Sequence, residues 1–290
     1  MDFSVALQIF LSGLNLGCIY AALGLGFYII YNVTRVLNLA QGEFVMLGGM
    51  LTVSFYTASI PLFPSILLAV VITAAVGAGI YRIMIYPARK ASGMIRVFIT
   101  LGCAFIIEGI ALLVWGWEFR SLPAFFNTPS IQLWDATIFG QTPWVIGITL
   151  LMVIALFLFF GRTIQGKALR ACADEPLGAR TMGISIEKMA LFSFILAAAL
   201  GAVVGALITP LTMTSYSMGL PLTAKGLLAA FVGGITRPEG VILGGLVYGM
   251  IESMTAGLIS GGYHGVIALA ILIGLLVFRR RGLLVTAGKG

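Results

Sequence analysis

Charged residues are scarce in this chain. Only 9% of its 290 residues are charged and 60% are hydrophobic, and the mean hydropathy is +1.09. A water-soluble domain cannot bury that much apolar surface. The composition therefore excludes a soluble protein and indicates one that lies in a membrane.

Histidine and cysteine are also rare. The chain has one histidine, His264, and three cysteines that stand far apart, Cys18, Cys103 and Cys172. A single histidine excludes a histidine-based metal cluster and Ser-His-Asp catalysis. The cysteine spacing fits neither a disulfide framework nor a zinc site. The sequence thus predicts no metal site and no catalytic residue.

Apolar segments follow one another along nearly the whole chain. They lie near residues 6–31, 44–60, 62–81, 97–117, 143–160, 189–209, 222–236, 240–258 and 263–278. A spanning helix needs roughly 20 mostly apolar residues. The N-terminus lacks the basic region and cleavage site of a removable signal peptide, so we interpret it as the start of the first span. We expect one all-α domain over residues 1–290, a polytopic transmembrane helix bundle of about eight or nine membrane segments.

Basic residues predict the orientation of this bundle, because Lys and Arg concentrate in short cytoplasmic loops. If the chain crosses the membrane at each segment, 15 of its 17 basic residues share one side, and only Arg120 and Lys225 do not. The shared side holds Arg35, Arg82, Arg89, Lys90, Arg96, Arg162, Lys167, Arg170, Arg180, Lys188, Arg237, Arg279, Arg280, Arg281 and Lys289. We therefore expect an outside N-terminus and a cytoplasmic C-terminus. Clusters this short do not form the extended basic face that nucleic acid requires.

The segment 222–236 leaves the number of spans open. Its 15 residues reach only about 22 Å as an α-helix, and it contains Gly226, Gly233 and Gly234. Segments 222–236 and 240–258 either cross fully or dip into the membrane and return as a broken hairpin. Irregular backbone at membrane depth requires a covering of protein or a water-filled cavity. The second alternative therefore makes the pair part of a solute path.

The run GRTIQGKA, Gly161 to Ala168, is one residue short of a phosphate-binding P-loop. That motif needs a Ser or Thr after its lysine to hold magnesium, and a preceding β-strand. Here Ala168 has no hydroxyl group, and the preceding residues 143–160 form a membrane helix. We expect no nucleotide site in this chain, so any ATP is bound by partner subunits.

Two longer loops suit contact with other proteins. Residues 161–188 combine charges with a helix-compatible apolar pattern on the predicted cytoplasmic side. This composition is typical of a docking surface and equally of a solvated interfacial helix. Residues 118–142 form the longest predicted outer loop and are rich in aromatic residues. They suit either a partner interface or the aromatic belt at the membrane surface.

Five polar residues lie in or beside apolar segments and are candidates for lining a solute path. A carboxylate costs roughly 2.5 to 3.5 kcal/mol at the centre of a membrane helix, so Glu108 and Glu252 are expected to face the protein interior. Each either lines a path for a solute ammonium or makes a structural hydrogen bond. Glu252 follows a glycine-rich segment, which favours a path role there, whereas Glu108 lies deep within its span, which favours a structural role. The turn with Asn38, Gln41 and Glu43 is either a helix-breaking path element or a capped cytoplasmic turn.

These features occur together in one family. The N-terminal signature of LivH-type permeases of branched-chain amino acid ABC importers resembles the stretch GLNLGCIYAALGLGFYIIYNVTRVLNLAQGEFVMLGG. Their ATPase-coupling loop and following helix are similar to ADEPLGARTMGI and FSFILAAALGAVVGAL, and their C-terminal segment to FVGGITRPEGVILGGLVYGMIE. The pieces stand in the right order over nearly the whole chain. The sequence departs from the family at Gln41, where His is frequent, and at Gly178, where Ala is common.

The resemblance implies a multi-pass permease of the bacterial inner membrane, without a catalytic site or cofactor of its own. It implies four kinds of partner: a second, LivM-type permease, two ATPase subunits, a soluble substrate-binding protein and the solute. It also assigns contact with the ATPase to Asp174, Glu175, Pro176, Arg180 and Gly183. The solute is a branched-chain amino acid or, by the range of the family, urea, a short amide or an aromatic acid. The competing class is an ion-driven secondary transporter that uses the intramembrane carboxylates.

Overall fold

The computed structural model describes residues 3–123, 131–133, 136–138 and 140–258, together with residues 270 and 274. Apart from one short antiparallel hairpin, β1 (Ile131–Leu133) with β2 (Ala136–Ile138), the regular structure in these residues is helical. The helices are α1 (Phe3–Thr34), α2 (Gln41–Thr57), α3 (Leu62–Gly79), α4 (Gly93–Trp115), α5 (Thr142–Arg162), α6 (Ile164–Asp174), α7 (Pro176–Thr181), α8 (Ile186–Thr212), α9 (Gly219–Gly233) and α10 (Pro238–Leu258). A π-helical turn, Ile80–Ile85, extends α3, and a 3₁₀ turn, Pro87–Lys90, follows it.

Six of the described helices are long and apolar enough to cross a membrane: α1, α3 with its π-helical turn, α4, α5, α8 and α10. This confirms a helical membrane protein. Eight of the nine predicted segments coincide with helices to within four residues at each end. Two of these eight helices, α2 and α9, are shorter, with 17 and 15 residues. The ninth segment, 263–278, lies outside the described residues, as do the basic residues from Arg279 onward.

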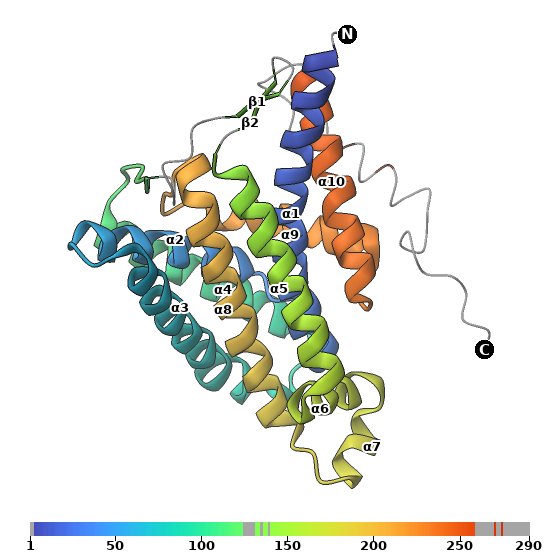
Figure 1. Cartoon of the computed structure of the whole chain (residues 1–290). Helices are drawn as coiled ribbons and strands as arrows, with labels where there is room; N and C mark the ends of the chain where they lie inside the picture. Colours follow the sequence, from blue (N-terminus) through green and yellow to red (C-terminus); the bar gives the residue numbers. More distant parts are fainter. Residues whose placement is uncertain are drawn as a thin grey trace.

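Helix α1 forms the centre of the bundle and packs most extensively against α10 (Figure 1). The two helices approach through small residues. A Cβ atom on Gly249 would overlap the backbone of Gly17, and one on Gly245 would overlap the backbone of Ala21. Gly13 likewise faces the backbone of Met250. Membrane helices associate closely where small residues allow their backbones to touch, and the four-residue glycine spacing of both helices provides that contact.

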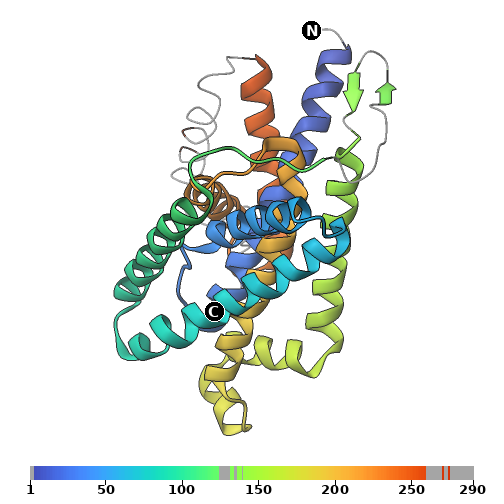
Figure 2. The same cartoon turned by 90° about the vertical axis from the view of Figure 1, so that its left-hand side faces the viewer.

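The two short helices differ from the others in direction and depth. Figure 2 shows α2 lying nearly across the bundle at mid-height, with α3 sloping beneath it. A non-helical segment with the buried residues Val36, Asn38 and Ala40 leads from the end of α1 to the start of α2 and ends in a turn. The first turn of α9 contacts the first turn of α2, because Gly42 packs directly on Gly219 and Thr223. Two helix N-termini therefore meet inside the bundle.

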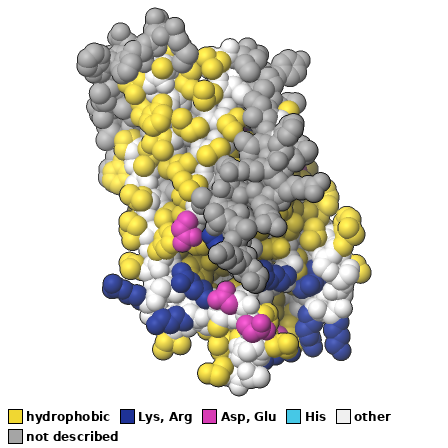
Figure 3. Space-filling model, turned by 90° about the vertical axis from the view of Figure 1, so that its right-hand side faces the viewer, with side chains coloured by type: hydrophobic (Ala, Val, Ile, Leu, Met, Phe, Trp, Pro, Cys, Tyr) yellow, Lys and Arg dark blue, Asp and Glu magenta, His cyan; other side chains and the backbone are white. Residues whose placement is uncertain are grey.

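One end of the bundle carries most of the described basic residues, and we refer to it as the basic end. It contains α6, α7, the 3₁₀ turn after α3, the segment after α1 and the turn between α9 and α10. Lys and Arg side chains gather toward this end in Figure 3. Arg35 donates to the Ala173 carbonyl at 2.6 Å, and Arg96 donates to the Thr34 carbonyl at 3.3 Å. The start of α1 lies at the opposite end (Figure 1).

Candidate functional site

The segment Asn38 to Glu43 is buried and joins four helices. Thr100 of α4 accepts from the Leu39 N–H at 3.0 Å and donates to the Leu37 carbonyl at 3.2 Å. Thr223 of α9 accepts from the Gly42 N–H at 2.9 Å and donates to the Leu39 carbonyl at 3.2 Å. These bonds supply partners that the backbone of a buried, non-helical segment needs. The segment is therefore buried within the bundle, and a path role for it stays a prediction.

Side-chain atoms of this segment remain without hydrogen-bond partners in the described structure. Asn38, Gln41 and Glu43 are each at most 1% exposed. Gln41 donates to the Ala197 carbonyl of α8 at 3.1 Å, whereas its Oε1 atom, the Asn38 Nδ2 atom and both Glu43 carboxylate oxygens have no partner. Buried polar groups are usually satisfied. These side-chain atoms can therefore form further hydrogen bonds inside the bundle.

Glu43 lies where the two helix N-termini meet. It belongs to the first turn of α2, and its carboxylate packs directly on Gly219, the first residue of α9. Any side chain at Gly219 would overlap the Glu43 carboxylate. Helix N-termini carry partial positive charge, which favours a carboxylate at this position. Glu108 of α4 is half-buried and lies within electrostatic range of Glu43, so the structure brings these two predicted residues into one neighbourhood.

Glu252 belongs to a different cluster, which also contains Tyr20 and Lys225. Lys225 of α9 donates to Glu252 of α10 at 2.6 Å and to the Tyr20 hydroxyl at 3.1 Å. The Tyr20 hydroxyl of α1 donates to the other Glu252 oxygen at 2.7 Å. Sequence reasoning noted Lys225 only as a basic residue on the outer half. The signal that it had a buried partner was its isolation in an apolar segment, since a membrane charge is usually paired.

A cavity of about 400 Å³ lies beside this cluster, away from the basic end. The loop after α4 closes over it, because Arg120 and Thr214 exchange two backbone hydrogen bonds of 2.9 and 2.7 Å. This contact involves the first part of the predicted outer loop 118–142. Residues 124–130, 134–135 and 139 of that loop lie outside the described residues.

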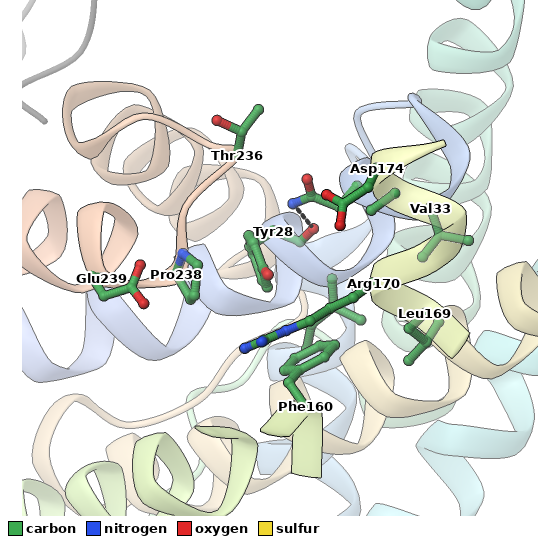
Figure 4. Close-up of a pocket in the computed structure, with 12 residues that line it drawn as sticks. Tyr28, Val33, Phe160, Leu169, Arg170, Asp174, Thr236, Pro238 and Glu239 are labelled. Atoms are coloured by element: carbon green, nitrogen blue, oxygen red, sulfur yellow. Dashed lines mark hydrogen bonds between the residues drawn. The ribbon is translucent and has the colours of Figure 1, made fainter. Parts of the chain in front are cut away.

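A second cavity of about 300 Å³ lies at the basic end, between α1, α6 and the start of α10 (Figure 4). Arg170, Asp174 and Glu239 line it around Tyr28. The Asn32 amide donates to the Tyr28 carbonyl at 2.8 Å and to the Ile235 carbonyl at 3.3 Å. The end of α1 is therefore hydrogen-bonded to the turn that connects α9 to α10.

The predicted coupling residues form a compact helical projection at the basic end. Asp174 ends α6, Pro176 begins α7, and Glu175 lies between the two helices. Beyond α7, Gly183 has φ +80°, its N–H donates to the Arg180 carbonyl at 3.0 Å, and the Ile184 N–H donates to the Ala179 carbonyl at 3.0 Å. This pair of bonds is the glycine-dependent Schellman stop of a helix. It gives the projection a defined end.

The surface of this projection combines apolar and charged side chains. Leu177 is 74% exposed and Met182 is 83% exposed. Glu175 is also exposed, and Arg180 faces Glu187 at 3.9 Å with both side chains largely exposed. Exposed apolar residues framed by charges are typical of a protein-binding surface.

The P-loop-like run takes a different structure from a nucleotide site. Gly161 and Arg162 end helix α5, and Thr163 caps α6 by accepting from the Gly166 N–H at 2.9 Å. A helix therefore occupies the place of the strand that a P-loop requires. Lys167 lies in the first turn of α6.

Comparisons with known proteins place this arrangement in a family. Residues 9–276 match the sequence model described as "Branched-chain amino acid transport system / permease component". The chain is 27% identical over 298 residues to LivH, the high-affinity branched-chain amino acid transport system permease protein of Salmonella typhimurium, covering 98% of this chain and 96% of LivH. It is 27% identical over 294 residues to BraD of Pseudomonas aeruginosa, covering 96% and 95%.

A solved structure has a similar fold. PsaBC from Streptococcus pneumoniae, solved in complex with a Fab, aligns with a TM-score of 0.52 at 13% identity, covering 96% of this chain and 91% of that chain. Since the family match extends over most of the sequence and includes α2, α9, the buried segment and the helical projection, the chain belongs to the branched-chain amino acid transport permease family.

Proposed function

We propose that this chain is the membrane-spanning permease subunit of an ATP-driven importer for branched-chain amino acids. The family match over residues 9–276 carries this proposal, and the relatives agree over nearly their whole lengths. Urea, short amides and aromatic acids are the alternative solutes.

The basic end is the cytoplasmic end in this proposal. Short loops rich in Lys and Arg stay in the cytoplasm, and the described basic clusters lie together at that end (Figure 3). The N-terminus then faces outward. With α2 and α9 counted as membrane segments, the chain has eight described segments and a ninth if residues 263–278 also cross.

In this proposal, the partner proteins bind at both ends of the bundle. The projection formed by α6 and α7 docks on an ATPase subunit, through Leu177 and Met182 with the charges of Glu175 and Arg180 around them. ATP binds to that subunit, and this chain needs no cofactor of its own. A soluble binding protein delivers the solute at the opposite end, and a second homologous permease completes the path.

Reconstitution of the complete complex in vesicles tests this function. We expect uptake of labelled leucine, isoleucine or valine that requires both ATP and the loaded binding protein. Unlabelled urea, acetamide and benzoate should not compete. Uptake of leucine driven by an ion gradient, with the ATPase subunits left out, would contradict the proposal and support a secondary transporter.

Charge reversal on the projection tests the ATPase contact. Glu175→Lys and Arg180→Glu should uncouple ATP hydrolysis from uptake, because each reverses an exposed charge at the docking surface. Glu175→Asp and Arg180→Lys are the controls and should keep coupling. Unchanged coupling in both reversed variants would remove the assignment.

A further inference from the structure

The cavity beside Lys225 has one charged corner and largely apolar walls. Helices α1, α8 and α9 supply Leu16, Ile19, Ile208 and Leu222 to the walls. Thr212, the last residue of α8, and Ser215, in the loop after it, also line the cavity. Its volume of about 400 Å³ falls in the range of small-molecule sites. The shape and chemistry suit a small molecule with an aliphatic body and one charged group.

The charge that this corner offers to a ligand is positive. The Lys225 side chain is 28% exposed, whereas the Glu252 side chain is only 3% exposed. A lysine ammonium has three donors. Two of them are directed at Glu252 and at the Tyr20 hydroxyl, which leaves one for a ligand acceptor. The Lys225 ammonium is therefore partly neutralised and held in place, and it still faces the cavity.

We propose that this cavity receives an aliphatic amino acid on its way through the bundle, and that Lys225 binds its carboxylate. The apolar walls hold the branched side chain, because burial of aliphatic surface is favourable. Urea and simple amides carry no carboxylate, so the same geometry selects against them. The inference rests on the proposed function and specifies its substrate class.

Glu252 has a positioning role in this proposal. Glu252 also lines the cavity, but its side chain is only 3% exposed, and its carboxylate fixes the ammonium of Lys225, together with Tyr20. The assignment replaces the direct contact with a solute ammonium that the sequence suggested for Glu252. The assignment also explains why Lys225 is paired with Glu252. A lysine that binds the carboxylate of a solute must stay charged while no solute is bound, and a neighbouring carboxylate favours that charge.

A charge-removal cycle separates binding from a purely structural ion pair. Lys225→Met leaves Glu252 buried without its partner, so the informative variant is the double change Lys225→Met with Glu252→Gln, which removes both charges. We expect the double variant to assemble into the complex and to keep ATP hydrolysis stimulated by the loaded binding protein. Its leucine uptake should fall about ten- to hundredfold, the factor that a hydrogen bond to a charged group contributes. Lys225→Arg keeps the charge and should retain part of the uptake.

A labelling experiment measures the cation directly. In a chain with Cys18, Cys103 and Cys172 changed to Ala, Thr212→Cys places a thiol at the exposed rim of the cavity. A thiosulfonate reagent that carries a sulfonate should modify this thiol about tenfold faster than one that carries a quaternary ammonium. The double variant should lose that preference. In the complete complex, leucine should slow the modification, whereas 3-methylbutylamine, which lacks only the carboxylate, should not.

The outcomes separate this inference from the proposed function. Leucine uptake at the unmodified rate in the double variant, or equal modification by both reagents, would overturn the role of Lys225 while leaving the importer assignment intact. If the unmodified complex takes up no amino acid and the labelling preference is still present, the proposed function fails and the cation site stands. Equal protection by leucine and 3-methylbutylamine would overturn carboxylate recognition.

Discussion

Two buried glutamates of this bundle lie in opposite surroundings. Glu252 has a lysine and a tyrosine hydroxyl at hydrogen-bond distance, whereas neither carboxylate oxygen of Glu43 has a partner in the described structure. The helix N-termini of α2 and α9 favour its charge. Removing one partner of a buried ion pair lowers stability, whereas removing a buried charge that has no hydrogen-bond partner raises it.

The change from Glu to Gln at each position tests this contrast. Glu252→Gln should lower the free energy of unfolding by about 3 kcal/mol, because it leaves Lys225 without its ionic partner. Glu43→Gln should raise it by about 1 kcal/mol, because it removes a buried carboxylate whose oxygens have no hydrogen-bond partner in the described structure. Thermal unfolding of the purified single chain in detergent measures both. Destabilisation of similar size in the two variants would contradict the difference in surroundings.

The sequence identified individual polar residues as candidates for a solute path. It did not show which of them lie together in the folded chain. A carboxylate in an apolar run is recognisable, which identified Glu108 and Glu252, whereas Glu43 was a candidate as part of the polar turn that also holds Asn38 and Gln41. The partner of Glu252 lies 27 residues before it, and the Tyr20 hydroxyl lies 232 residues before it. No local pattern joins such positions. The expectation that Glu108 faces the interior is met only in part, because its side chain is half-buried.

At the scale of the elements, helix α7 depends on a glycine at one position and tolerates a side chain at another. Gly183 has φ +80°, a conformation that costs a residue with a side chain roughly 1 to 2 kcal/mol. Gly178 lies within α7, and a Cβ atom there would come within 3.1 Å of the flexible Glu175 side chain. The two glycines are only five residues apart, so they form a matched pair.

Substitution by alanine should therefore separate them. Gly183→Ala should destabilise the end of α7, while Gly178→Ala should stabilise the helix by up to about 1 kcal/mol, because Ala has the higher helix propensity. Hydrogen exchange of the α7 amides gives the readout: faster in the first variant and slower in the second. Equal exchange in both variants would contradict the described helix end.

The contact between α1 and α10 makes a second prediction about elements. Gly249→Val places a branched side chain against the backbone of Gly17. The valine side chain should push the two helices apart and lower the free energy of unfolding by about 1 to 3 kcal/mol. The yield of folded chain should fall as well. Gly109→Val on α4 is the control, because no atom lies within 4 Å of a Cβ atom there. Size-exclusion profiles of the detergent-purified chain, before and after heating, compare the two variants.

The sequence located these elements well because apolar length is the main determinant of a membrane helix. It did not reveal the direction of α2 or that its first turn meets α9. Hydropathy measures how apolar a segment is and carries no information on tilt. The segment before α2 looked equally like a surface turn, because Thr100 and Thr223, which accept from the Leu39 and Gly42 N–H groups, are remote in sequence.

For the whole molecule, the proposed orientation makes a direct prediction. Trp117 is 76% exposed just beyond the end of α4, away from the basic end, and Leu177 is 74% exposed on the projection at the basic end. In intact cells, a membrane-impermeant maleimide should label Trp117→Cys and not Leu177→Cys, which should react only after permeabilisation.

The unmodified chain is the natural control for this labelling. Cys18, Cys103 and Cys172 are buried, and burial raises the pKa of the Cys172 thiol, which disfavours its reactive thiolate. Background labelling should therefore be low. Labelling of Leu177→Cys in intact cells would contradict a cytoplasmic basic end.

The glycine contact between α1 and α10 also governs how the protein is made. The ribosome delivers α1 first, yet its principal packing partner is the last helix described, more than 200 residues later in the chain. Until α10 enters the membrane, the small-residue face of α1 has only lipid or an insertion factor against it. A nascent chain stopped before Pro238 therefore lacks its central contact, however many spans it has inserted. Quality-control proteases should distinguish such a fragment from the finished subunit by that uncovered face.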